Sequence, residues 1–188
     1  MTSPIHLAKY GTYKEFCLVY DPVTMPFDPE AGVVGLLGQA VANKDPRERL
    51  AIANRLLDDG ADPSLVSTSG DRVNVLHVLW GRERDRDAEA EAVLIARLLD
   101  GGADINLRSP RFGLSLASLA TGISPSPEYL RAAFRAVTEH SRPDLTAHVD
   151  QKRDASVGQY LAMTRRGLMR DEVLAYAAAT GQNIDAIS

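Results

Sequence analysis

Histidines and a spaced run of glycines are the residues of this chain whose types could support catalysis or phosphate binding. The four histidines are His6, His77, His140 and His148. None follows another by four residues, so the helical histidine pair of a zinc protease is absent. Gly32, Gly35 and Gly38 are spaced unlike either phosphate-binding fingerprint, and we expect them to allow close helix packing. The sequence therefore predicts no catalytic residue, no metal site and no cofactor.

Two of the reactive side chains, Cys17 and His77, have ordinary structural interpretations. Cys17 is the only cysteine, which excludes a disulfide framework and a cysteine-based metal set. Because it lies between Phe16 and Leu18, we expect it in the core. His77 falls on the apolar face of an expected helix, where a hydrogen-bonded structural role is favoured over that of a base or metal ligand.

Arginine and aromatic residues in three expected loops, 64–73, 106–113 and 146–155, are the candidate binding residues. These residue types carry much of the energy of protein interfaces, through large contact areas or bidentate hydrogen bonds. The candidates in these loops are Arg72, Arg108, Arg111, Phe112, His148, Lys152 and Arg153, and Trp80, near the end of an expected first helix, could join them. Trp80 could instead be buried between structural units, and Tyr160 is similarly ambiguous. The basic residues suit a protein partner that presents carboxylates or an acidic cleft, and they would help to steer association.

The elements that position these loops are predicted by a repeated phrase. Arg-Leu-Leu-Asp-Asp-Gly-Ala-Asp-Pro at 55–63 returns as Arg-Leu-Leu-Asp-Gly-Gly-Ala-Asp-Ile at 97–105, an offset of 42 residues. Apolar runs also open at 41-residue intervals, at Val34, Val75, Leu116 and Val157. The Gly-Ala-Asp segments have fainter echoes at 142–145 and 181–184. Repetition at this period indicates four copies of one supersecondary unit.

Each copy is expected to form two helices joined by a turn. In the second helix of the first unit the apolar stripe is Leu50, Ala53, Leu56 and Leu57. Arg49 is expected to lie mostly away from that stripe. Asp45 followed by Pro46 predicts the start of this helix, and Gly60 predicts its end. In the next unit Asp87 is the expected N-cap and Gly101-Gly102 the stop.

The segment from Asn74 to Leu79, followed by residues 92–106, resembles the ankyrin repeat. In that family a Thr-Pro-Leu-His turn opens the first helix, and Leu-Leu-x-x-Gly-Ala-Asp-x-Asn closes the second. By this resemblance His77 occupies the motif histidine, and the matches in the closing phrase are Gly102, Ala103, Asp104 and Asn106. Asn74 and Val75 replace the family's threonine and proline. The resemblance implies an all-α, ankyrin-like solenoid of stacked helix-turn-helix repeats with projecting loops.

The repeats are longer than the family's period of about 33 residues. The links 81–87 and 122–127 lengthen them. Residues 82–87 alternate in charge, which predicts a mobile, solvated link or else a protruding element that a partner grips. We expect one domain, 1–188, with an N-terminal cap or worn repeat at 1–32 and repeats at 33–72, 73–113, 114–154 and 155–188, since terminal repeats shield the end of a stack.

Composition narrows the class of protein further. With 188 residues, 45% hydrophobic and 24% charged, the chain can bury a core without a disulfide or metal. A net charge of −4 argues against a nucleic-acid partner. No apolar run is long enough to span a membrane and the first residues lack the pattern of a signal peptide, so a cytoplasmic location is expected. The arginine-rich, lysine-poor composition hints at a GC-rich bacterial genome.

These observations favour a protein–protein interaction module. The leading hypothesis is a bacterial immunity protein or inhibitor that binds and neutralises a toxin or enzyme through its concave face and loops. It rests on the family resemblance, because stand-alone ankyrin-like chains of this size occur among proteins that neutralise toxins, and on the lack of catalytic motifs. The alternative is a non-inhibitory scaffold or adaptor that recruits a protein partner. An enzyme would need converging acids and bases, which no spacing here demands.

Overall fold

The computed structural model describes residues 3–23, 34–81, 85–121, 126–150 and 153–185, and the statements below concern these residues. They contain ten helices and four short strands. In the N-terminal half these are α1 (Pro4–Tyr10), α2 (Tyr13–Cys17), α3 (Gly35–Val41), α4 (Pro46–Asp58), α5 (Val75–Trp80) and α6 (Ala88–Asp100). The remainder are β1 (Arg108–Ser109), β2 (Gly113–Leu114), α7 (Ser115–Thr121), α8 (Pro127–His140), β3 (His148–Asp150), β4 (Arg153–Ser156), α9 (Val157–Gly167) and α10 (Arg170–Thr180).

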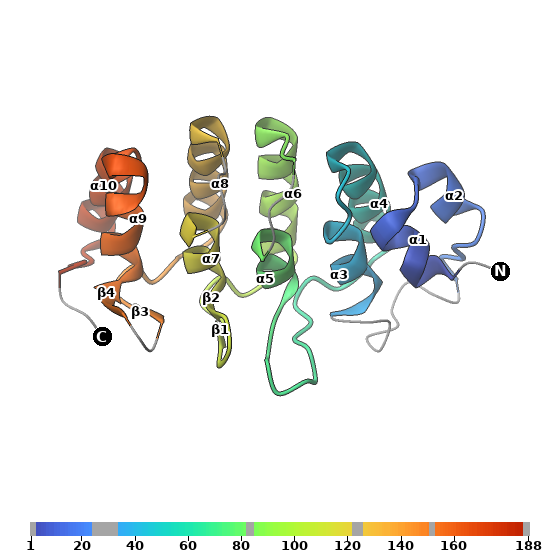
Figure 1. The fold of residues 1–188 in the computed structure, drawn as a ribbon, viewed down its shortest axis with the longest axis horizontal. Helices are drawn as coiled ribbons and strands as arrows, with labels where there is room; N and C mark the ends of the chain where they lie inside the picture. The colour runs from blue at the N-terminus through green and yellow to red at the C-terminus, as the bar shows by residue number, and fades with distance from the viewer. Residues whose placement is uncertain (1–2, 24–33, 82–84, 122–125, 151–152, 186–188) are drawn as a thin grey trace.

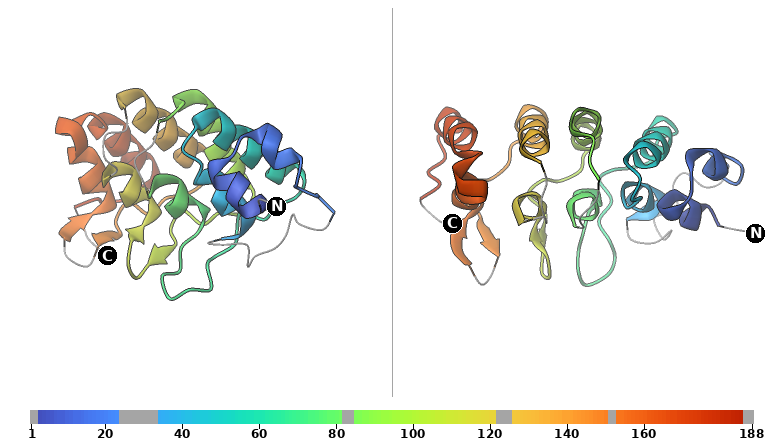
Figure 2. Two further views of the ribbon diagram at one scale, coloured as in Figure 1. Left: turned by 45° about the vertical axis from the view of Figure 1, so that its right-hand side comes forward. Right: turned by 45° about the horizontal axis from the view of Figure 1, so that its top comes forward.

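The helices form pairs that follow one another in a single row, with the chain ends at opposite ends of it (Figure 1). The first helices contact each other in the order α1, α3, α5, α7, α9, and the second helices in the order α2, α4, α6, α8. Both views in Figure 2 show the same order. Each of the five ranges expected from the sequence contains one helix pair, and the mostly helical architecture agrees with an all-α class.

Two β-hairpins project from one side of the row, as does the loop between α4 and α5 (Figure 1). Strands β1 and β2 pair antiparallel, with Arg108 opposite Leu114, and β3 pairs with β4. The sequence predicted plain loops at 106–113 and 146–155, so the hairpins are a correction. They form because facing backbone groups pair, and Gly113 at φ 71° lets the second strand turn directly into α7.

The predicted helix ends are confirmed. Asp45 accepts from the backbone N–H groups of the first turn of α4, and Asp87 does the same at α6. Gly60 (φ 92°) and Gly102 (φ 100°) take the left-handed conformation after these helices. The next turn has the same hydrogen bond in all four units: Asp62, Asp104, Asp144 and Asn183 each accept from the N–H two residues ahead, at 2.8, 2.8, 2.9 and 3.1 Å. The faint echoes at 142–145 and 181–184 are therefore in the predicted register.

One hydrophobic core runs the length of the row, from Ala8 to Ile184. The first leucine of each repeated phrase lies near the centre of this core, since Leu56 and Leu98 are fully buried. Such a side chain contributes about 1.5–3 kcal/mol relative to an exposed one. The expectation that Cys17 is in this core is wrong. Phe16 takes the inward position, stacked on Tyr20, and the next residue along the short helix α2 is exposed.

Candidate functional site

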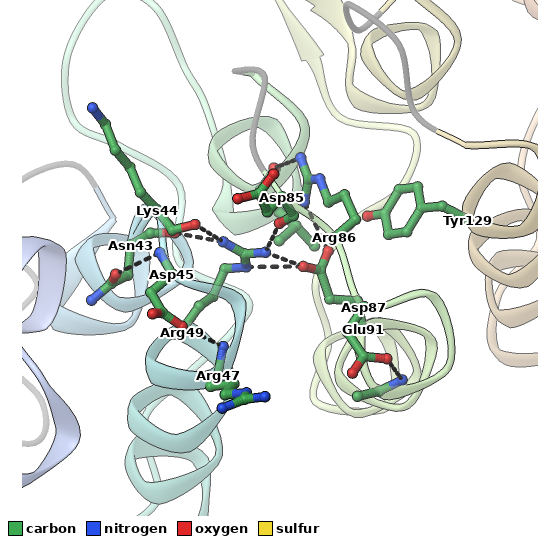
Figure 3. A network of polar contacts seen from close by, with 12 residues as sticks. Asn43, Lys44, Asp45, Arg47, Arg49, Asp85, Arg86, Asp87, Glu91 and Tyr129 are labelled. Atoms are coloured by element: carbon green, nitrogen blue, oxygen red, sulfur yellow. Dashed lines mark hydrogen bonds and ion pairs between the residues drawn. The ribbon is translucent and has the colours of Figure 1, made fainter.

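A buried polar network joins successive helix pairs (Figure 3). Arg49, expected to lie away from the apolar stripe, is completely buried between α4 and α6. Its Nε donates to Glu91 Oε1 at 3.0 Å, and its Nη atoms donate to the carbonyl oxygens of Asn43 and Asp85, both at 2.6 Å. Glu91 is also fully enclosed. The correction has a clear cause, because stacking places the start of the next second helix over Arg49.

Arg86 extends the network to a third helix pair. It donates to Glu91 Oε2 and to the Leu79 carbonyl, both at 2.8 Å, and its guanidinium lies 5.0 Å from the centre of the Tyr129 ring. Burial raises the pKa of Tyr129 well above its usual range. The expectation of a solvated link at 82–87 is thus wrong for Arg86, whereas residues 82–84 lie outside the described residues. Arg49 and Glu91 expose no surface, so they are not accessible to a partner. Their hydrogen bonds run between α4 and α6, and the network therefore holds neighbouring units together.

His77 also has a structural role, as predicted. It is buried, and its Nε2 lies 3.1 Å from the Gly113 carbonyl oxygen, which can only accept. The ring therefore ties α5 to the hairpin that precedes α7. Burial lowers the pKa of His77 below its usual value of 6.5, because it disfavours the charged ring.

The exposed candidate residues gather on the hairpin side, around one buried hydroxyl. Ser109, 2% exposed, donates from Oγ to the Asp71 carbonyl oxygen. Ser109 Oγ also accepts from the N–H groups of Arg111 (3.3 Å) and Phe112 (3.1 Å). Ser109 thus fixes the hairpin turn and attaches it to the preceding loop. Sequence reasoning missed this residue, although a serine before Pro-Arg-Phe-Gly is a recognisable turn signal.

The turn presents a large cationic and aromatic surface. Phe112 is 50% exposed, and the Arg111 guanidinium lies 5.0 Å from its ring centre. Nη1 of Arg111 is 3.6 Å from Asp71 Oδ2. On β1, Arg108 donates to the His148 carbonyl oxygen at 2.7 Å and so connects the two hairpins. We call Asp71, Arg72, Arg108, Arg111 and Phe112 the hairpin cluster.

The remaining candidates are placed unequally. Arg72 is exposed beside Asp71, and His148 is half-buried. Arg153 belongs to β4, but its side chain lies outside the described part, as does Lys152 altogether. The expectation that Trp80 contacts a partner is wrong. The ring is 3% exposed, and its Nε1–H donates to the Tyr129 hydroxyl at 3.2 Å, because the end of α5 faces α8 across the stack.

Charge is distributed unevenly along the chain. The segments 64–73, 106–113 and 146–155 contain five Lys or Arg residues against three acids. The rest of the chain contains 16 bases against 22 acids. These three segments together carry a net positive charge, whereas the rest of the chain carries a net negative charge.

No known family model matches the sequence, and no curated protein matches it either. A solved structure is similar: the crystal structure of a functionally unknown protein from Leptotrichia buccalis C-1013-b. The two have a TM-score of 0.74 and 15% sequence identity over 96% of each chain. At this identity the likeness shows the fold alone. Within the described ranges, no helix is long and apolar enough to cross a membrane, and no three His, Cys, Asp or Glu side chains are grouped to hold a metal ion.

Proposed function

We propose that this protein is a protein–protein interaction module, an ankyrin-like solenoid that acts as a bacterial immunity protein or inhibitor of a toxin or enzyme. The hairpin cluster carries the proposal. Exposed arginine and aromatic side chains are the residues that most often dominate binding energy. Their turn is already fixed by Ser109, so little conformational freedom would be lost on binding.

The distribution of polar groups favours binding over catalysis. The enclosed titratable side chains Glu91 and His77 are bonded within the fold and do not open to solvent. On the exposed side, Arg108 and Arg111 are suited to holding carboxylates. A non-inhibitory adaptor would use the same surface, so the activity of the bound partner separates the two functions.

Affinity capture from the native host tests the proposal. The native protein and an Arg111→Glu/Phe112→Ala variant serve as parallel baits, with Val93→Ala as a control on the exposed face of α6. We expect an enzyme that the native bait and the Val93 variant retain, that the double variant loses, and that is silenced when bound. A partner that stays fully active would support the adaptor instead. Equal capture by the double variant would place binding elsewhere and contradict the proposal.

A further inference from the structure

Arg72 has a backbone conformation that arginine rarely adopts. Its φ is 44°, in the left-handed region, where a Cβ atom is crowded by the neighbouring carbonyl. Gly113 is 41 residues further along, the same interval that separates Val75 from Leu116, and has φ 71°. The corresponding turn before α7 therefore uses glycine, which adopts this conformation without strain. Strain at an exposed side chain points to a function for that side chain.

The turn around Arg72 is held by local hydrogen bonds. The Arg72 N–H donates to the Ser69 carbonyl oxygen at 3.1 Å, and the Val73 N–H donates to Ser67 Oγ at 3.0 Å. Ser109 bonds the carbonyl oxygen of Asp71, the residue before Arg72. The strained residue is thus fixed next to the hairpin turn.

Asp71 pairs only loosely with the neighbouring Arg111, so the Arg111 guanidinium is available to bind another carboxylate. Their closest charged atoms are 3.6 Å apart, beyond a good hydrogen bond, and the Arg111 side chain is 69% exposed. Exposed pairs of this kind contribute little to stability, so another carboxylate can replace Asp71 at small cost. Planar guanidinium groups bind carboxylates through two parallel hydrogen bonds.

We propose that Arg72, Arg108 and Arg111 recognise carboxylates on an acidic protein partner, with Phe112 as the apolar anchor. The arginine at position 72 lowers the stability of the fold but contributes to this binding. The inference rests on the proposed function and names the partner's chemistry. Charge complementarity supports it, since the segments 64–73, 106–113 and 146–155 together are basic and the rest of the chain would repel an acidic partner. Three arginines are too few to bind nucleic acid tightly in an acidic chain.

An NMR titration tests the recognition directly. The probes are a short acetylated peptide of alternating Glu and Leu, its Gln counterpart, and a single-stranded oligonucleotide of equal charge. The Glu peptide should shift the Nε–H signals of Arg72, Arg108 and Arg111 saturably, while the Gln peptide should not. The exposed Arg131 and Arg135 on α8 are internal controls. Equal shifts at the controls, equal effects of the Gln peptide, or tighter binding of the oligonucleotide would overturn the proposal.

Substitution of Arg72 separates strain from binding. Arg72→Gly removes both strain and charge, so the thermal midpoint should rise while Glu-peptide affinity falls about tenfold. Arg72→Lys keeps the strain and a charge, and should lower affinity less without changing the midpoint. Unchanged peptide affinity in the glycine variant, or a midpoint that does not rise, would contradict the inference.

The same variant distinguishes this inference from the proposed function. A captured enzyme that binds Arg72→Gly as tightly as the native protein would refute the role of Arg72 and leave the interaction module standing. If no partner is captured but the peptide results are as expected, the proposed interaction function would be refuted. The proposal that the three arginines bind carboxylates would still stand.

Discussion

The buried network and the hairpin cluster both join neighbouring helix pairs through an arginine and a carboxylate, but in opposite surroundings. Arg49 and Glu91 have no exposed surface and several short hydrogen bonds. Arg111 and Asp71 are 69% and 40% exposed, and their charged atoms are 3.6 Å apart. A buried charge that loses its partner is costly, whereas an exposed one exchanges its partner easily. The comparison indicates that the enclosed pair stabilises the stack, whereas the exposed pair is suited to the recognition proposed for the hairpin cluster.

The largest expected effect comes from breaking the buried network. Glu91→Gln keeps the shape of the side chain but leaves Arg49 and Arg86 without a counter-charge, and should lower the free energy of unfolding by about 3–5 kcal/mol. Urea denaturation measures this loss. The control is Glu172→Gln, which removes an exposed partner of Arg131 and should cost no more than about 1 kcal/mol. Equal losses would refute the comparison.

A pair of glycines, Gly158 near the C-terminal end and Gly70 in a projecting loop, should show the same contrast between a tightly packed and an exposed position. A Cβ atom on Gly158 would lie 2.5 Å from Ile184 Cγ2 and 3.1 Å from Leu145 Cβ. Gly158→Ala should therefore destabilise the protein by about 1–3 kcal/mol through overpacking. Gly70 in the loop between α4 and α5 has nothing within 4 Å of such an atom. Gly70→Ala should change stability by at most about 0.5 kcal/mol in thermal unfolding, and a comparable loss would show that this loop is packed tightly.

Ser109 combines features of both regions, because it is buried yet fixes an exposed turn. Ser109→Ala should cost about 1 kcal/mol in chemical denaturation, since the hydroxyl bonds to Asp71, Arg111 and Phe112 are lost. It should also weaken partner binding by loosening Phe112. Ser69→Ala, at an exposed serine of the same side, is the control. Native affinity in the Ser109 variant would mean that the turn needs no such support.

The smallest expected effect is a pH dependence from His77. The unfolded chain takes up a proton near pH 6.5, whereas the buried ring does so only at lower pH. Acid therefore favours unfolding as the pH falls below about 6.5, with a slope of at most about 1.4 kcal/mol per pH unit for one proton. Denaturation between pH 7 and 5.5 should show this slope in the native protein and lose it in His77→Gln. An unchanged slope would exclude His77 as its source.

Much of the fold was predictable because the signals are local. The caps at Asp45 and Asp87 and the turn at Gly60 depend on residues a few positions apart. The burial of Arg49 could not be predicted, because its partner Glu91 is 42 residues away and meets it only when the pairs stack. For the same reason the sequence left two interpretations of Trp80 open, because its partner Tyr129 is 49 residues away.

The candidate site also contains residues that the sequence predicted and one that it did not. Arg72, Arg108, Arg111 and Phe112 were expected in projecting loops, and the structure exposes all of them on the hairpin side. Ser109 was missed because its hydroxyl bonds depend on the exact turn and on the neighbouring loop. That these residues bind a partner remains a prediction.

The most direct test of the central claim is a calorimetric titration of the captured partner with Phe112→Ala and with Val93→Ala, paired with the thermal midpoint of each variant. Phe112 is 50% exposed on the hairpin side and Val93 is 61% exposed on α6. We predict that Phe112→Ala weakens binding at least about tenfold with an unchanged midpoint, while Val93→Ala binds like the native protein. The opposite result, native affinity without Phe112 and lost affinity without Val93, would contradict the claim that recognition lies on the hairpin side.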